Sequence, residues 1–315
     1  MDARVTKVTQ SRRNRTWKRM LKQRYLYLLL LPGIILLAVF HYAPLYGVVI
    51  AFKKYNPIRG VFGSPWLDPW FSNFTKLFGN VLFERVLTNT IVLNLYSIAV
   101  AFPAPILLAL MLNELNAKRF KSLAQTLTYM PHFLSWVIVG TFVTEVLSPY
   151  TGVMSLLARL FGFEYSKALL ASPAHFKTIA VFSGMWKEIG WASIVYLAAI
   201  TSINPDYYDA ARIDGAGRLK QTLHVTLPSI VPTIIALFVL RLGGILGANF
   251  EQIFVLMNAS NQPAADVIAT FVYREGLQKG NYSYTAAVGL FQSVVGFFFI
   301  IGANTISKRF DNQMW

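Results

Sequence analysis

The sequence predicts an all-α membrane protein with six transmembrane helices and both termini in the cytoplasm. Three observations lead to this fold class: 55% of the 315 residues are hydrophobic, only 14% are charged, and the mean hydropathy is +0.47. A soluble domain carries about 25% charged residues. The long apolar runs disfavour an ordinary cytosolic enzyme and exclude a disordered chain, and the absence of Cys excludes a disulfide scaffold or a thiolate metal site.

Six segments are apolar over the roughly 20 residues that a helix needs to cross a bilayer. The third segment is interrupted by Pro131 and His132. The fourth contains Lys187 and Glu188, so we expect it to face protein or a cavity and not lipid. The six predicted spans are residues 26–51, 90–112, 128–147, 179–203, 230–257 and 286–306.

The first apolar run follows a basic stretch, as the core of a secretory signal would. Its length exceeds the roughly 7–15 apolar residues of a signal core, and no small-residue cleavage site follows it. The sequence therefore predicts a retained transmembrane helix.

The orientation follows from the positions of Lys and Arg. With the N-terminus inside, the predicted inner segments hold 17 of these residues and the longer outer segments hold 10, which agrees with the positive-inside rule. Residues 1–25 are then a basic cytoplasmic arm, residues 26–306 the membrane domain, and residues 307–315 a cytoplasmic tail. The arm holds much of the net charge of +15. Nucleic-acid binding is an alternative reading, but orientation and contact with anionic lipid explain the charge without a further partner.

The sequence contains no recognisable catalytic or metal-binding pattern. A Walker A motif is absent, and the run GAGRLK at residues 215–220 lacks the third Gly of a dinucleotide loop. The four His residues are isolated from one another, and no G-x-S-x-G elbow is present. We therefore predict that the chain is not an enzyme and binds no metal.

One predicted inner segment, residues 204–229, differs from the other connections. Pro205 fits the first turn of a helix, which Asn204 or Asp206 would cap. Gly215 or Gly217 would end or bend that helix, and Pro228 would begin the next one. Small residues flanked by charge suit docking into a cleft of another protein, and a solvated connecting loop is the alternative reading.

This segment resembles the EAA loop of permease subunits in binding-protein-dependent ABC importers. That pattern reads Glu-Ala-Ala, three residues, Gly, nine residues, Ile, one residue, Leu-Pro. The chain has the same spacing from Asp209 to Pro228, with Asp for Glu and Val225 for Ile. The resemblance implies that residues 204–229, the coupling segment below, contact an ATPase subunit. The residues assigned to this coupling are Asp206, Asp209, Ala210, Ala211, Asp214, Gly215, Gly217 and Pro228.

The resemblance extends over roughly residues 20–315, and residues 126–140, 249–258 and 266–295 look like the sugar-importing branch. It implies a type I ABC importer permease fold in a bacterial inner membrane and a carbohydrate substrate, most closely an oligosaccharide. The implied partners are a second permease, two cytoplasmic ATPase subunits that hold ATP and Mg²⁺, and an external solute-binding protein. No cofactor is expected in this chain itself.

Three alternatives to this function remain open from the sequence. Permeases for another solute, such as a peptide, share the loop but differ in the flanking segments. An ion-coupled secondary transporter would need an internal repeat and a buried carboxylate relay, and neither is visible. A membrane-anchored enzyme lacks a candidate catalytic cluster.

Polar and aromatic residues of the predicted spans are candidates for the substrate pathway. Aromatic planes suit the C–H faces of sugar rings, while charged and amide groups suit the hydroxyls. The alternative reading is that the charged residues pair with one another to hold helices together. The candidates are Glu145, Trp186, Lys187, Glu188, Trp191, Tyr196, Arg241, Asn249, Glu251 and Gln252.

Overall fold

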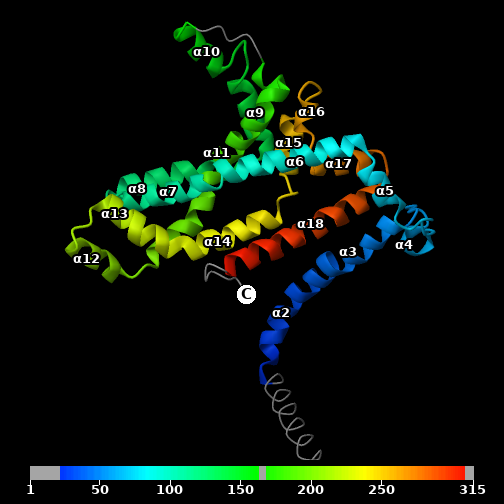
Figure 1. Cartoon of the computed structure of the whole chain (residues 1–315), viewed down its shortest axis with the longest axis horizontal. Coiled ribbons are helices and arrows are strands. Elements are labelled where there is room, and N and C mark those ends of the chain that lie inside the picture. The colour runs from blue at the N-terminus through cyan, green and yellow to red at the C-terminus, as the bar shows by residue number, and fades with distance from the viewer. Residues whose placement is uncertain (1–21, 163–167, 309–315) are drawn as a thin grey trace, which may run out of the picture. The chain divides into compact units, whose positions relative to one another are not determined.

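The computed structural model of the chain describes residues 22–162 and 168–308, which Figure 1 shows as coloured ribbons. The described part is built from helices and turns, with one isolated β-bridge between Lys53 and Trp66. Most of the predicted basic arm (residues 1–21) and of the predicted tail (residues 309–315) lies outside the described residues. The chain divides into two compact units, Met1–Trp70 and Phe71–Trp315.

The first unit contains an uninterrupted 29-residue helical stretch from Arg24 to Phe52 with a mean hydropathy of 2.1. It corresponds to the first predicted span. A π-helical turn precedes Pro44, because a proline lacks the N–H for the bond to the residue four before it and its ring clashes with that carbonyl. The elements are α2 (Arg24–Leu37), η1 (Ala38–Tyr42), α3 (Ala43–Leu45), η2 (Tyr46–Phe52) and α4 (Gly60–Gly63).

The second unit holds the remaining helices, including the coupling segment. Its elements are α5 (Ser72–Phe78), α6 (Val81–Val100), α7 (Pro103–Glu114), α8 (Lys118–Tyr129), η3 (Met130–Phe133), α9 (Trp136–Val146), α10 (Val153–Leu160), η4 (Leu169–Ala171), α11 (Pro173–Thr201), α12 (Pro205–Ile213), α13 (Arg218–Gln221), η5 (Thr222–Thr226), α14 (Leu227–Gly243), α15 (Phe250–Leu256), α16 (Gln262–Ala265), α17 (Ile268–Val272), η6 (Tyr273–Gln278) and α18 (Tyr282–Lys308).

Four helical stretches among the described residues are long and apolar enough to cross a membrane, and a bent pair of helices makes a possible fifth. The fourth predicted span corresponds to α11, which has 29 residues but includes Lys187 and Glu188. Length and composition therefore support a multi-pass membrane protein, while the count of six remains a prediction. The four stretches are Arg24–Phe52, Val81–Glu114, Arg218–Gly243 and Tyr282–Thr305.

The third predicted span, residues 128–147, is not one straight helix. The stretch Lys118–Phe133 meets α9 at an angle of 104°. Pro131 lies in the 3₁₀ turn before the bend, and Ser135 begins the next helix by accepting the N–H of Ile138 at 3.3 Å. A proline followed by a new N-cap ends one helix and starts another.

The fifth predicted span, residues 230–257, does not coincide with one helix. The helix begins at Arg218, ten residues before Pro228, and the turn before that proline is π-helical, as it is before Pro44. The helix ends at Gly243, because glycines are poor helix formers and Gly243 and Gly244 occur together. A non-helical connection then leads to the separate helix α15.

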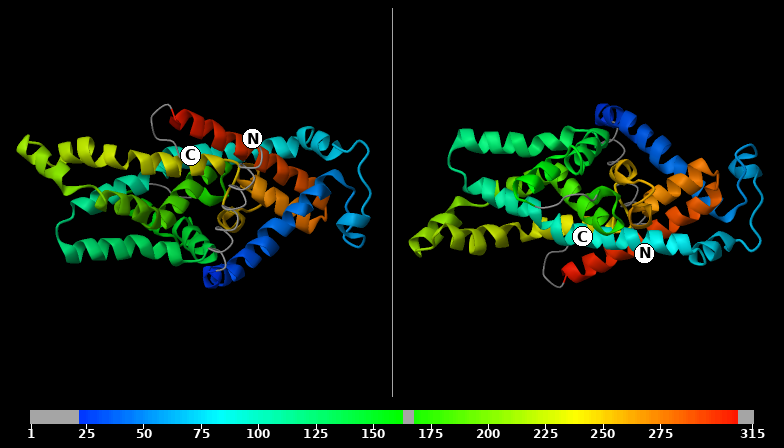
Figure 2. Two further views of the ribbon diagram at one scale, coloured as in Figure 1. Left: turned by 90° about the horizontal axis from the view of Figure 1, so that it is seen from below. Right: turned by 90° about the horizontal axis from the view of Figure 1, so that it is seen from above.

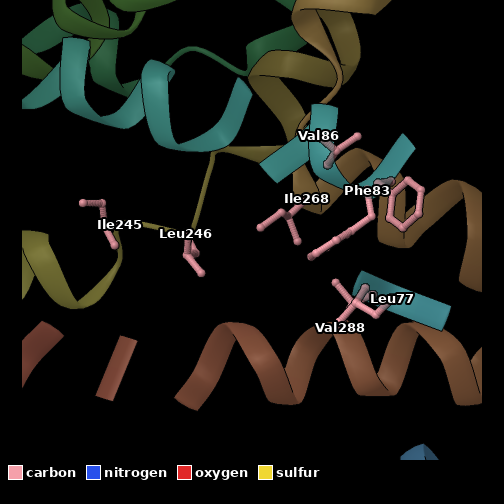
Figure 3. Close-up of a cluster of buried hydrophobic side chains, with 8 residues drawn as sticks. Leu77, Phe83, Val86, Ile245, Leu246, Ile268 and Val288 are labelled. Atoms are coloured by element: carbon pink, nitrogen blue, oxygen red, sulfur yellow. The ribbon is translucent and has the colours of Figure 1, made fainter. Parts of the chain in front are cut away.

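Three buried clusters hold the second unit together. One joins α5, α6, α17 and α18 to the connection after α14, and Figure 3 shows Phe83, Ile268 and Val288 packed together in it. Another joins α7, α11 and α14 through Ala109, Tyr196 and others. The helix α7 contacts α11, and α14 contacts α18. Figure 2 gives two further views of these helices. These clusters fix the helices that line the cavity described below.

Candidate functional site

The coupling segment begins with a capped helix, α12. The side chain of Asn204 accepts the backbone N–H of Asp206 at 3.1 Å, and Pro205 occupies the first helical position. This satisfies one of the N–H groups that a helix start leaves without a partner. Of the two predicted caps, Asn204 is the residue that caps the helix.

The helix ends in a left-handed turn at Gly215, which has φ +75°. The N–H of Ala216 donates to the carbonyl of Ala211 at 2.8 Å, and the N–H of Gly215 donates to that of Arg212 at 3.0 Å. Such a pair of bonds around a left-handed glycine is a common helix end. Gly217, with φ −67°, instead precedes α13 as its N-cap.

The coupling segment presents an exposed surface on a fixed base. Ile213 is 87% exposed and Tyr207 is 60% exposed, while the hydroxyl of Tyr208 lies 2.9 Å from the buried hydroxyl of Thr226. Because Thr226 belongs to the π-helical turn that runs into α14, this contact ties α12 to the long helix Arg218–Gly243. Figure 1 shows α12 beside α13.

The predicted coupling residues therefore lie close together on one segment. Asp209 forms an exposed ion pair with Arg212 at 2.8 Å, a type of pair that contributes little stability. Asp206, Asp209, Ala210 and Ala211 are on α12, Asp214, Gly215 and Gly217 are in the turn that follows, and Pro228 is in the first turn of α14. Their contact with an ATPase stays a prediction.

A cavity of about 610 Å³ lies among α6, α7, α9, α11, α14, α15 and the connection of residues 244–249. This volume is within the range of about 300–1,000 Å³ that small-molecule sites have. Most of the lining is apolar. Of the ten predicted pathway residues, five line this cavity: Glu188, Tyr196, Arg241, Asn249 and Gln252.

The other five predicted residues lie elsewhere. Trp186 stacks on Phe142 with ring centroids 5.8 Å apart, and Trp191 stacks on His132 at 4.5 Å. Lys187 is on the face of α11 that packs against η3. Glu145 and Glu251 are exposed residues of α9 and α15 outside the lining.

Glu188 belongs to a polar cluster at the cavity wall. Its Oε2 lies 2.7 Å from Nδ1 of His132, and its Oε1 lies 3.3 Å from Nζ of Lys187. The Lys187 ammonium also donates to the backbone carbonyl of His132 at 2.7 Å. For Lys187 and Glu188, the geometry therefore agrees with the alternative reading, in which the two residues form a structural ion pair.

The backbones of α8 and α11, next to this cluster, are in close contact at Gly190. A Cβ atom added to Gly190 would collide with the backbone carbonyl of Thr128. Only a residue without a side chain lets α11 approach α8 this closely, and this approach places His132 against Glu188.

Arg241 contacts no carboxylate among the described residues. One of its terminal nitrogens, Nη2, donates to Oγ of Ser97 at 2.8 Å, a bond that joins α14 to α6. The alternative reading, in which every charged candidate pairs with another, therefore does not hold for Arg241.

Amide side chains close the break between α14 and α15. Asn94 donates to the carbonyls of Thr90 and Gly247, the latter at 2.8 Å. Asn249 caps α15, and Gln252 donates to the carbonyl of Ala180 at 2.6 Å. The bond of Asn94 to Gly247 and the cap at Asn249 satisfy backbone groups that the break would otherwise leave without partners, while the bond of Gln252 ties α15 to α11.

Sequence reasoning missed four polar or aromatic lining residues: Asn94, Ser97, Phe102 and Trp136. Asn94 and Ser97 are three residues apart in the mainly apolar second half of α6, which places both on one face. That spacing was the available signal. No comparable sequence signal identifies Phe102 and Trp136, because aromatic residues are frequent throughout the chain.

A buried ion pair fixes the helices behind the cavity wall. Asp266 is fully buried and accepts two bonds from Arg274, at 3.2 and 2.6 Å. The hydrogen bond to Asp266 raises the pKa of Arg274 above its ordinary value. Asn89 of α6 donates to the backbone carbonyl of Asp266, so the pair is part of the contact between α6 and α17.

The comparisons with known proteins agree on one class. The family model described as "Binding-protein-dependent transport system inner membrane component" matches residues 101–312. The polygalacturonan/rhamnogalacturonan transport system permease protein YteP of Bacillus subtilis (strain 168) is 41% identical over 304 residues, which are 96% of this chain and 94% of that protein.

Two solved structures are also similar over nearly the whole chain. One is a bacterial ABC transporter involved in the import of the acidic polysaccharide alginate, with a TM-score of 0.85 and 42% identity over 94% of this chain and 99% of that one. The other is a bacterial alginate ABC transporter in complex with an alginate pentasaccharide-bound periplasmic protein, with a TM-score of 0.85 and 41% identity over 95% and 99%.

Proposed function

The chain belongs to the family of binding-protein-dependent transport system inner membrane components, and from this membership we propose that it is one permease subunit of an ATP-driven carbohydrate importer. Membership confirms the predicted class of a non-catalytic transport component over a secondary transporter or a membrane enzyme. The observation that carries the substrate class is the 41% identity, over 96% of the chain, with a permease named for polysaccharide transport.

In this proposal the chain crosses the bacterial inner membrane six times. Four long apolar stretches and the bent pair give five of these spans, and α11 is the sixth. Both termini and the coupling segment lie in the cytoplasm, in agreement with the excess of Lys and Arg in these segments. The charged residues of α11 contact protein groups, as intramembrane charges must.

The proposed partners are a second permease, two ATPase subunits that bind ATP and Mg²⁺, and an external binding protein. The exposed side chains of Tyr207 and Ile213 supply an apolar surface for the ATPase contact. Small residues such as Ala210 permit close approach at that surface.

The path of the force is one continuous helix. Movement of α12 passes through the Tyr208–Thr226 contact into the stretch Arg218–Gly243, which ends at the cavity wall. This stretch has 26 residues and is therefore about 39 Å long at 1.5 Å per residue. A rigid helix of that length can convert closure of the ATPases into a change of the wall at Arg241.

The proposal is tested by reconstituting the complete complex in proteoliposomes and measuring uptake of a labelled oligosaccharide with the binding protein outside. Uptake against a gradient should require ATP and both ATPase subunits. Concentrative uptake by the permeases without the ATPases would refute the proposal.

A further inference from the structure

We propose that Arg241 is the anion-binding residue of the cavity and that it receives a carboxylate of an acidic oligosaccharide during transport. This inference rests on the proposed carbohydrate function and narrows its substrate class from sugars in general to sugar acids. It concerns a contact between one side chain and the transported molecule.

The hydrogen bonding of Arg241 leaves most of its guanidinium available. A guanidinium carries five N–H donors, and among the described residues only the bond from Nη2 to Ser97 is present. The Ser97 hydroxyl fixes the orientation of the side chain without neutralising it. A planar fork held in this way is suited to a bidentate bond with a carboxylate.

The charges of the cavity lining point to an anionic ligand. Glu188 and Arg241 are the two charged side chains in the lining. The negative charge of Glu188 is offset by the nearby Lys187, whose side chain is only 7% exposed and lies behind the wall. Arg241 has no such partner among the described residues, so the lining carries one uncompensated positive charge. A charge next to an apolar wall attracts an opposite charge more strongly than it would in water.

The neutral part of the wall suits the rest of a sugar acid. The amide nitrogens of Asn94 and Gln252 donate to backbone carbonyls, so the amide oxygens of these side chains remain as acceptors for sugar hydroxyls. Trp136, Tyr196 and Phe102 supply aromatic surface for the C–H faces of the rings. A cation, two amide acceptors and aromatic surface match a polyhydroxylated acid better than a neutral sugar.

The similar proteins agree with this substrate chemistry. Alginate is described as an acidic polysaccharide, and polygalacturonan is a polymer of a sugar acid. Neither name says which side chain binds a carboxylate. That assignment comes from the charges and hydrogen bonds of this cavity.

The competing explanation is that Arg241 pairs with a carboxylate of the second permease. The test therefore compares two probes that differ only in charge: trigalacturonate and its fully methyl-esterified form. Binding to the assembled complex of permeases and ATPases is measured by the change in tryptophan fluorescence, without the binding protein, because that protein has its own preference for substrates.

The wild-type complex should bind trigalacturonate about tenfold more tightly than the ester, since a charge-assisted bidentate bond is among the strongest hydrogen bonds. Arg241→Gln should remove this preference and leave binding of the ester unchanged. Arg241→Lys should retain part of the preference, because it keeps the charge and loses the fork. Lys76→Gln, which changes an exposed cation of α5 outside the cavity, is the matched control and should behave as the wild type does.

Several results would overturn the inference. Equal binding of the two probes by the wild type, or of neither, would show that the cavity has no carboxylate site. A similar loss for both probes in Arg241→Gln, or a failure of this variant to assemble with the second permease, would support the subunit contact instead. The proposed function is judged separately: ATP-dependent uptake of neutral and acidic oligosaccharides alike would leave it standing while refuting the role of Arg241.

Discussion

The coupling segment is held mainly by short-range contacts, with one long-range bond that Thr222 donates to Glu114 at 3.4 Å. The cavity wall is held by bonds between residues far apart in the chain. The Tyr208–Thr226 contact joins residues 18 apart. The Arg241–Ser97 and Asn94–Gly247 bonds join residues 144 and 153 apart. The first region can therefore move as a small rigid piece, while the second changes only when several helices move. The two regions are joined by the stretch Arg218–Gly243, so this helix determines how far movement of one reaches the other.

The largest effect is expected at Gly215, where the coupling helix ends. Its φ of +75° is a left-handed conformation, which costs a residue with a side chain about 1–2 kcal/mol, and more for a β-branched one. We expect Gly215→Val to redirect the end of α12 and to lower ATP-driven uptake by roughly tenfold while the protein still reaches the membrane. Uptake in proteoliposomes and the amount of protein in the membrane fraction are the measurements.

Gly217→Val is the matched control for this variant, because it places the same side chain in the same segment at an ordinary φ. Gly217 has φ −67°, and a Cβ atom at either glycine would meet no atom within 4 Å. The two substitutions therefore differ in backbone conformation and not in crowding. Normal uptake by Gly215→Val, or an equal loss in both variants, would contradict the role of the left-handed helix end.

The two ends of α12 could be narrowed to two candidate residues each, because they depend on neighbouring residues, whereas the next helix was expected from Pro228 and begins at Arg218. The cap at Asn204 and the end at Gly215 follow from residue types within a few positions. The cavity could be predicted only in part. Arg241 and Glu188 were identifiable as charges in apolar runs, but the bend after Pro131 and the break after Gly243 decide which side chains meet. Such breaks are stabilised by partners far away in sequence, such as Asn94, and a single sequence does not show these contacts.

The next largest effect is expected at Gly190, which tests whether contacts between residues far apart in the chain hold the cavity wall. Gly190→Ala places a methyl group against the backbone of Thr128. Overpacking of this kind costs about 1–3 kcal/mol and should also separate His132 from Glu188. The measurements are the melting temperature of the purified protein in detergent and uptake by the complex.

Gly289→Ala in α18 is the control for Gly190, because a Cβ atom there meets no atom within 4 Å. This variant should be as stable as the wild type or slightly more so, since Ala favours a helix over Gly. If the two alanine variants melted at the same temperature, the close packing of α8 on α11 would not limit the stability of the wall.

A smaller effect is expected from Asn204→Ala, which removes the cap of α12. Loss of such a cap costs about 1 kcal/mol. Because the contact between Tyr208 and Thr226 remains, α12 should fray at its start without detaching. Hydrogen exchange should then rise at the amides of residues 206–208 and stay unchanged in α14. Faster exchange throughout the stretch Arg218–Gly243 would show that the coupling segment and the cavity wall unfold together and not independently.

The smallest effect is expected at Glu275, where a short-range contact occurs within the helices that support the wall. Glu275 accepts bonds from Lys279 at 2.7 Å and Asn281 at 3.2 Å. The bond from Lys279 is the main reason that the pKa of Glu275 lies below its ordinary value. A lowered folded-state pKa means that the ionised carboxylate stabilises the protein above the unfolded carboxyl pKa of about 4.3. This stabilisation disappears as the pH falls through the folded value.

Glu275→Gln should therefore melt slightly below the wild type at pH 7, and the two should converge at pH values on the acid side of that range. Lys279→Met should have a similar effect at pH 7, and the double variant should lose less than the sum of the two single changes. Melting curves of the four proteins between pH 3 and pH 7 test this (range chosen to bracket the carboxyl titration). A difference that persisted unchanged at low pH would show that Glu275 acts through packing. A larger effect than that of Gly190→Ala would mean that local contacts, and not distant ones, govern the stability of the wall.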